Sequence, residues 1–220
     1  MADQSRCFHV RLRGELACFS RPELKTERVS YSIPTPSALR GIFEAKLWKP
    51  ALIWRVDEIR VLAPIAYLQF RRNEVNERCS DRTANAVRKS DDAWNYYADE
   101  DRAQRNTIAL RNVDYVIRAH MELTARQGPG DSIRKFEEMF ERRLEKGQHV
   151  TQPVLGCREF PCSVEAGGES IAPISHSEDF GWMLHDIRFG QENRPVFFHA
   201  VMKEGVVIVP PFPEKGDVAK

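Results

Sequence analysis

The sequence contains no hydrophobic run that approaches the ~20 residues of a membrane-spanning helix. Its first ten residues, MADQSRCFHV, lack the basic segment and apolar core of a secretory signal. Cysteine is scarce, with five in 220 residues; the odd number argues against a disulfide framework, so we expect reduced thiols in the cytoplasm. Cys157 and Cys162 form a C-x4-C pair with no second pair at metal-binding spacing, so we expect no zinc site there.

Several motifs that carry enzyme chemistry are absent as well. The sequence has no H-E-x-x-H or paired carboxylate pattern for a metal, no G-x-S-x-G elbow for a serine nucleophile, and no glycine-rich loop for a nucleotide phosphate. Metalloprotease, serine hydrolase and nucleotidase functions therefore lack their basic requirement. We expect neither a metal nor a cofactor.

The net charge of +1 conceals an uneven distribution. Residues 1–72 contain 13 Lys and Arg against 7 Asp and Glu, whereas residues 73–220 contain 20 against 25. Arginine accounts for 24 of the 33 basic residues, and its planar fork suits phosphate contacts and base stacking. Genomic composition explains the arginine content equally well, so charge alone only suggests a nucleic-acid partner.

Hydrophobic periodicity predicts a mixture of strands and helices. Alternating apolar residues predict strands over residues 7–19, 52–70 and 113–124. Gly14 should mark a bulge in the first of them. Thr35 followed by Pro36 is a strong helix-start signal, and this helix should end before Pro50. A second, amphipathic helix is predicted over residues 131–147.

The order of these elements predicts an α+β fold. Through residue 150 the order is strand, helix, strand, strand, helix, strand, which is the ferredoxin-like arrangement found in many RNA-binding modules. We therefore predict a ferredoxin-like domain over residues 1–150 and a small, β-rich antiparallel C-terminal part over residues 151–220. Residues 72–106 are highly charged and lack periodicity, so we predict a partly mobile insertion there.

His120 is the main candidate for chemistry. Arg118, His120 and Glu122 alternate along one strand and therefore project from the same face. A histidine can move a proton near neutral pH, and a neighbouring arginine can neutralise charge that develops on a phosphate. RNA supplies its own nucleophile, the ribose hydroxyl, so its cleavage requires no metal. The alternative is a surface histidine balanced by Glu122 beside a solvated arginine, which is more common for an isolated R-x-H.

The first helix carries cations beside features that suit a polyanion. Ser37 and Arg40 lie near its N-terminus, where free amide groups favour a phosphate, and Lys46 and Lys49 lie near its far end. Trp48 offers a ring on which a base can stack, although a tryptophan at a helix end more often belongs to the core. The cations alone are equally typical of a solvated helix face.

Six segments together resemble the CRISPR-associated Cas5 family in its subtype I-C form. They are ACFSRPELKTERVSYSIPTPSALRGIFEAKLWKP, VDEIRVLAPI, RRNEV, QRNTIALRNVDYVIRAHMELT, QPVLGCREFPCSVE and FFHAVMKEGVV. They occur in the expected order from about residue 10 to about residue 207, whereas residues 76–101 and the C-terminal tail carry little resemblance. The coverage makes the match specific.

The resemblance implies a RAMP-type protein with a defined activity and set of partners. Such a protein cleaves CRISPR precursor RNA within each repeat without metal, leaving a 2′,3′-cyclic phosphate and a 5′ hydroxyl. It keeps the 5′ handle of the crRNA and joins the backbone and large subunits of the type I-C Cascade complex. Some members also bind duplex DNA.

The catalytic residues of the family carry over only in part. His120 is retained, whereas Arg118 replaces a lysine and Leu47 replaces a tyrosine of the family pattern, and neither replacement transfers a proton readily. We therefore predict catalytic roles for His120, Arg118 and Lys46. The predicted RNA-binding residues are Arg13, Ser37, Arg40, Trp48, Lys49, Arg71, Arg72 and Arg158. The alternatives are a weak or inactive handle-binding subunit and a general nucleic-acid-binding protein.

Overall fold

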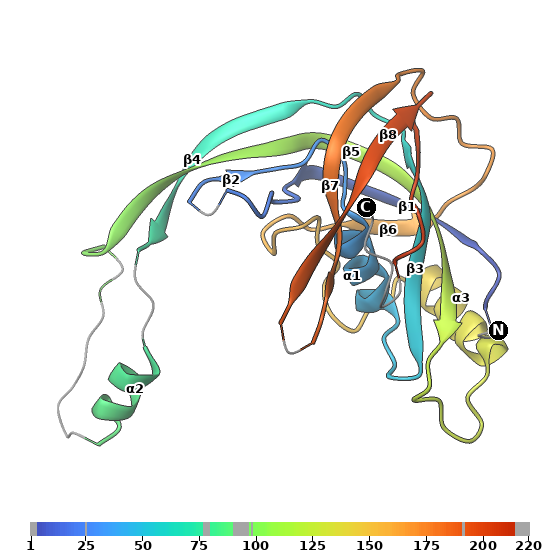
Figure 1. Ribbon diagram of the computed structural model, residues 1–220, viewed down its shortest axis with the longest axis horizontal. Helices are drawn as coiled ribbons and strands as arrows, with labels where there is room; N and C mark the ends of the chain where they lie inside the picture. The colour runs from blue at the N-terminus through green and yellow to red at the C-terminus, as the bar shows by residue number, and fades with distance from the viewer. Residues whose placement is uncertain are drawn as a thin grey trace.

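A single antiparallel sheet with few helices dominates the protein (Figure 1). The computed structural model describes residues 4–24, 26–76, 80–89, 97, 99–190 and 192–213. The elements are β1 (Phe8–Ala17), β2 (Arg28–Val29), α1 (Pro36–Lys46), β3 (Leu52–Val61), β4 (Tyr67–Val75), α2 (Asp81–Val87), β5 (Arg102–Leu123), α3 (Ile133–Glu145), β6 (Ser163–Ala166), β7 (Glu178–Arg188), β8 (Arg194–Lys203) and β9 (Val206–Ile208). Within the described residues, no helix has the length and apolar character needed to cross a membrane.

The strands follow the order β6-β1-β5-β3-β9-β8-β7, and β2 and β4 also pair with β5. All of these pairings are antiparallel except the short one between β2 and β5. Strand β6 pairs with β1, and β9 pairs with β3, so one sheet joins the two parts that were predicted on either side of residue 150. The predicted α+β class with antiparallel strands is therefore confirmed.

Helices α1 and α3 pack on one face of the sheet around an aromatic cluster. The Thr35 hydroxyl accepts a hydrogen bond from Ala38 N at 3.3 Å, so the predicted helix start is confirmed. The cluster consists of Phe8, Phe43, Trp54 and Phe140, whose neighbouring ring centroids lie 4.7–6.0 Å apart. The strands β1 and β3 and the helices α1 and α3 each contribute one ring to the cluster, which therefore fixes both helices against the sheet.

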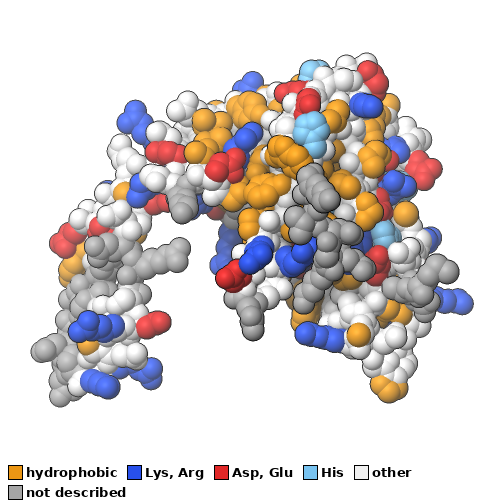
Figure 2. Space-filling model, viewed as in Figure 1, with side chains coloured by type: hydrophobic (Ala, Val, Ile, Leu, Met, Phe, Trp, Pro, Cys, Tyr) orange, Lys and Arg blue, Asp and Glu red, His pale blue; other side chains and the backbone are white. Residues whose placement is uncertain are grey.

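Strands β4 and β5 form a long hairpin that extends away from the body and carries α2 at its far end (Figure 1). A deep hollow separates the outer part of this hairpin and α2 from the rest of the molecule (Figure 2). The prediction of an irregular insertion over residues 72–106 is wrong for 72–75 and 102–106, which pair regularly in the sheet. Polar side chains on both faces of an exposed hairpin hide the strand alternation. Residues 77–79, 90–96 and 98 of the predicted insertion lie outside the described residues.

Gly14 does not form the predicted bulge. It pairs with Val113 without a register shift, and a Cβ at this position would lie 2.3 Å from Leu155 Cδ1. Close packing therefore explains the glycine. The bulge occurs on β3 instead, where the register with β5 shifts between Val56 and Glu58.

Candidate active site

A cavity of about 530 Å³ brings His120 together with residues from distant parts of the chain. It is bounded by α1, by the start of β3, by β5, by β7 and by residues 209–213. The polar side chains that line it are Gln4, Arg40, Arg55, Asp57, His120, Glu122, His185 and Asp186. Arg40 of the first helix thus shares a cavity with His120, whereas Lys46 does not line it.

Asp57 orients His120 from the bulge in β3. The bulge makes Asp57 the extra residue between two regular pairs of the ladder, and such irregularities redirect side chains. His120 Nδ1 donates to Asp57 Oδ2 at 2.9 Å. This hydrogen bond raises the pKa of His120 above its ordinary value, although burial of the ring opposes the shift, and the nearby charges add to the increase.

Glu122 completes the surroundings of His120. Its Oε1 lies 3.6 Å from His120 Nε2, and its Oε2 accepts a hydrogen bond from Arg55 Nε at 2.7 Å. Burial opposes ionisation, but the Arg55 hydrogen bond and charge lower the pKa of Glu122. His120 Nε2 has no hydrogen-bond partner among the described residues. The raised pKa favours the imidazolium form of the ring, whose Nε2 is buried beside Glu122.

His185 is a second histidine that lines the cavity, and it is not among the predicted site residues. Its Nε2 donates to the Pro210 carbonyl at 2.8 Å, while its buried Nδ1 has no partner within the described part of the chain. Burial lowers the pKa of His185, although the Pro210 carbonyl acts in the opposite direction. The cavity thus holds one histidine that favours the charged form and another that favours the neutral form. Because β7 lies far from β5 in the sheet order, no local pattern could have paired them.

Arg118 lies beside the cavity but does not line it. Its Nη2 is 3.7 Å from Glu58 Oε2, its side chain is 36% exposed, and its Nε has no hydrogen-bond partner in the described structure. Arg118 and His120 occupy alternate positions of β5 and share a strand face, as the sequence pattern predicted. Arg118 therefore retains capacity to bind an anion.

Lys46 lies elsewhere. Lys46 is 3% exposed. Burial lowers the pKa of its ammonium group, and the charge of the nearby Cys162 acts in the opposite direction. Lys46 lies six residues after Arg40 on α1, on a different side of the helix, and therefore does not face the cavity.

Substitution of Lys46 by methionine tests this placement. Lys46→Met should leave the rate of RNA cleavage unchanged and should slightly raise the free energy of unfolding, because methionine keeps the buried stem and removes a desolvated charge. Single-turnover cleavage and denaturant unfolding measure the two quantities. Lys146→Met, at an exposed position just after α3, is the matched control. A large loss of cleavage at Lys46 alone would return it to the site.

Several predicted RNA-binding arginines form ion pairs with carboxylates of the protein itself. Arg40 binds Asp186 through two hydrogen bonds of 2.7 and 3.0 Å and Glu44 through one of 2.7 Å. Arg13 contacts Glu165 at 2.6 Å. These arginines thus form intramolecular ion pairs in this structure.

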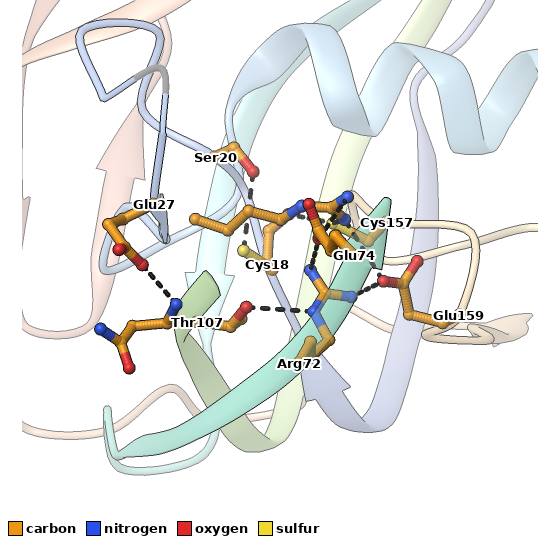
Figure 3. A network of polar contacts seen from close by, with 10 residues as sticks. Cys18, Ser20, Glu27, Arg72, Glu74, Thr107, Cys157 and Glu159 are labelled. Carbon is orange, nitrogen blue, oxygen red and sulfur yellow. Dashed lines mark hydrogen bonds and ion pairs between the residues drawn. The ribbon is translucent and has the colours of Figure 1, made fainter. Parts of the chain in front are cut away.

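Arg72, within β4 of the β4–β5 hairpin, also forms ion pairs with carboxylates. Figure 3 shows its guanidinium among Glu74, Thr107 and Glu159. This network ties the hairpin to the loop that carries Glu159. Arg72 therefore serves the fold of this region, while its sequence neighbour Arg71 is exposed.

Other predicted RNA-binding residues are accessible. Trp48 is 57% exposed, which places it on the surface. Lys49 lines a separate hollow beside α3, and exposed Arg158 lines another with Gly41 of α1. The Ser37 hydroxyl lies 3.0 Å from that of Thr35 and belongs to the helix cap.

Comparison with known proteins identifies relatives along nearly the whole chain. The family model for the CRISPR-associated protein Cas5 (Cas5d) matches residues 7–210. A protein from Mannheimia succiniciproducens, named CRISPR pre-crRNA endoribonuclease Cas5d, is 44% identical over 208 residues, covering 90% of this chain and 92% of the relative. A protein of the same name from Thermus thermophilus is 38% identical over 223 residues, covering 91% and 90%.

Solved structures support the fold. The crystal structure of a CRISPR-associated protein superposes with a TM-score of 0.71 at 24% identity, covering 99% of this chain and 98% of the other. A functionally uncharacterized protein from Streptococcus mutans gives a TM-score of 0.69 at 22% identity, covering 96% and 95%. The predicted resemblance is confirmed by the sequence matches: the chain belongs to the Cas5d family of CRISPR-associated proteins.

Proposed function

We propose that this protein is an endoribonuclease that cleaves CRISPR precursor RNA within the repeat and keeps the 5′ handle as a subunit of the type I-C Cascade complex. Both relatives above carry the name pre-crRNA endoribonuclease. The observation that carries the proposal is the cavity that two histidines line, His120, which Asp57 orients, and His185. The strand order β6-β1-β5-β3, with α1 and α3 as crossovers, further supports a ferredoxin-like unit of the RAMP type.

The proposed reaction needs two proton transfers. The ribose 2′ oxygen attacks the adjacent phosphorus and loses its proton to His185 Nδ1, while the bond from phosphorus to the 5′ oxygen breaks. His120 donates its Nε2 proton to that departing oxygen. The products are a 2′,3′-cyclic phosphate and a 5′ hydroxyl, and the two proton transfers require no metal. Arg118 neutralises charge on the phosphate in the transition state.

We propose that RNA is held mainly by the accessible cations and by Trp48. Arg71, Lys49 and Arg158 are exposed, and Arg158 lies near Gly41, where added side-chain atoms would meet nothing within 4 Å. Open space over α1 fits the approach of an RNA backbone. We assign Arg13, Arg40 and Arg72 to structural ion pairs that shape the surface around it.

Cleavage of the cognate repeat RNA in EDTA tests the proposal. The expected result is a 5′ fragment that ends in a cyclic phosphate and a 3′ fragment with a free 5′ hydroxyl. A substrate with a 2′-deoxyribose before the scissile phosphate should bind and remain intact. Tight binding of the repeat without any product would favour a handle-binding subunit. Equal affinity for scrambled hairpins or duplex DNA, falling steeply with salt, would favour a general nucleic-acid-binding protein.

The pH dependence of cleavage should be bell-shaped. The base His185 must be neutral, so activity should fall as the pH drops through its lowered pKa, below the ordinary 6.5. The acid His120 must be protonated, so activity should fall as the pH rises through its raised pKa, above 6.5. Asp57→Asn removes the charge that raises the pKa of His120, so the alkaline limb should move to lower pH while the acid limb stays. An unmoved alkaline limb in single-turnover rates would contradict this assignment.

A further inference from the structure

Two cysteines lie side by side outside the cavity. The backbone N–H of Cys18, just after β1, donates to Leu155 O at 3.0 Å, and Cys157 Sγ lies 3.7 Å from Cys18 O. The two thiols are also close enough to influence each other's ionisation. Figure 3 shows both residues next to the network of Arg72. Residues that are 139 positions apart in the sequence are therefore in direct contact.

The backbone fixes this contact. Gly156 has a φ of +85°, a region that L side chains rarely adopt, and a Cβ there would lie 2.0 Å from Cys18 O. The loop can therefore approach the end of β1 this closely only with glycine at position 156. The next residue, Cys157, is held beside Cys18 as a consequence.

Cys157 also has the surroundings of a reactive thiol. Arg28 Nη1 lies 3.7 Å from its Sγ, and the residue is only partly buried. The neighbouring Cys18 thiol lowers the pKa of Cys157 to about 6, with burial opposing and Arg28 and Arg72 assisting. Cys18 is the buried partner, and the same thiol contact and burial raise its pKa.

Two further cysteines lack these features and serve as internal comparisons. Cys7 is exposed, but burial of its sulfur and the charge of Asp57 raise its pKa. Cys162 is buried, and desolvation raises its pKa to about 12. Among the four cysteines that the structure describes, exposure alone would make Cys7 the first thiol to react, whereas the environment favours Cys157.

We propose that Cys157 is an oxidation site at which a hydroperoxide closes a reversible disulfide with Cys18. In the first step the Cys157 thiolate attacks one oxygen of hydrogen peroxide, the O–O bond breaks, and a sulfenic acid and hydroxide form. In the second step the Cys18 sulfur attacks the Cys157 sulfur, the S–O bond breaks, and the hydroxyl leaves with the Cys18 proton as water. Each thiol loses one hydrogen overall, and the peroxide is reduced to two waters. The bond would join the end of β1 to the loop that presents Arg158.

Peptide mapping of the oxidised full-length protein tests this site. The reduced protein is treated with equimolar hydrogen peroxide at pH 7, remaining thiols are alkylated, and the digest is examined by mass spectrometry. The expected product is a Cys18–Cys157 cross-linked peptide that dithiothreitol separates, with Cys7 and Cys162 recovered as alkylated thiols. The readout involves no RNA, so its failure and that of the proposed nuclease are independent.

Variants separate the two chemical steps. Cys18→Ser should leave a sulfenic acid at Cys157 that dimedone traps, whereas Cys157→Ser should leave Cys18 reduced and Cys7→Ser should leave the cross-link unchanged. Cys157→Ala replaces Cys157→Ser if the serine variant fails to fold. Oxidation of Cys7 ahead of Cys157, or a wild-type protein that accumulates sulfenic acid without the cross-link, would overturn the proposal.

Discussion

Replacement of His120 by alanine should reduce RNA cleavage by about 100- to 10,000-fold, the usual contribution of general acid–base catalysis. The reason is the loss of the proton that Nε2 gives to the departing 5′ oxygen in the proposed reaction. Binding of the repeat RNA should change little, because the accessible cations lie outside the cavity. Single-turnover cleavage under saturating protein, together with a binding titration of the 2′-deoxy substrate, separates the two effects.

His176→Ala is the matched control for this experiment. His176 Nε2 lies 3.1 Å from Glu178 Oε2, so the control also removes a histidine that contacts a carboxylate, but outside the cavity. It should retain wild-type cleavage, and both variants should show thermal unfolding close to that of the wild type. Wild-type cutting by the His120 variant would remove His120 from the mechanism and leave a handle-binding role.

The sequence predicted the parts of the site that depend on a single strand. Alternation along β5 places Arg118, His120 and Glu122 on one face, and this follows directly from strand geometry. Asp57 could not be predicted as the partner of His120, because it reaches the ring through a bulge that shifts the register of β3. His185 could not be predicted either, because its proximity depends on how β7 packs against α1.

The fold shows the same division between local and long-range information. The start of α1 is encoded by Thr35 and Pro36, and it is present as predicted. The pairing of β6 with β1 and of β9 with β3 joins segments more than 140 residues apart, and no local pattern reports such contacts. The outer part of the β4–β5 hairpin was missed, because residues 72–75 and 102–106 carry mostly polar side chains on both faces. Lys46 was misplaced because a helical position alone does not say which neighbours cover it.

Replacement of Trp54 by alanine should lower the free energy of unfolding by about 3–5 kcal/mol, the usual cost of removing a large buried aromatic side chain. Trp54 is 1% exposed, it contacts three rings of the aromatic cluster, and its Nε1 donates to Leu47 O at 3.0 Å. Trp54→Phe keeps much of the ring contact and loses this hydrogen bond, so it should cost about 1–2 kcal/mol. Denaturant unfolding measures both changes.

Trp48→Ala is the contrasting substitution six residues earlier in the chain. Because Trp48 is 57% exposed, its loss should change the free energy of unfolding by less than about 0.5 kcal/mol. If a base of the RNA stacks on this ring, affinity for the repeat should fall by roughly 5- to 150-fold, which corresponds to about 1–3 kcal/mol per stacked base. Unchanged affinity would show that Trp48 contacts no base, while a loss of stability equal to that of Trp54→Ala would contradict its surface position. The two substitutions therefore distinguish a tryptophan that stabilises the fold around the cavity from one that is proposed to contact the RNA.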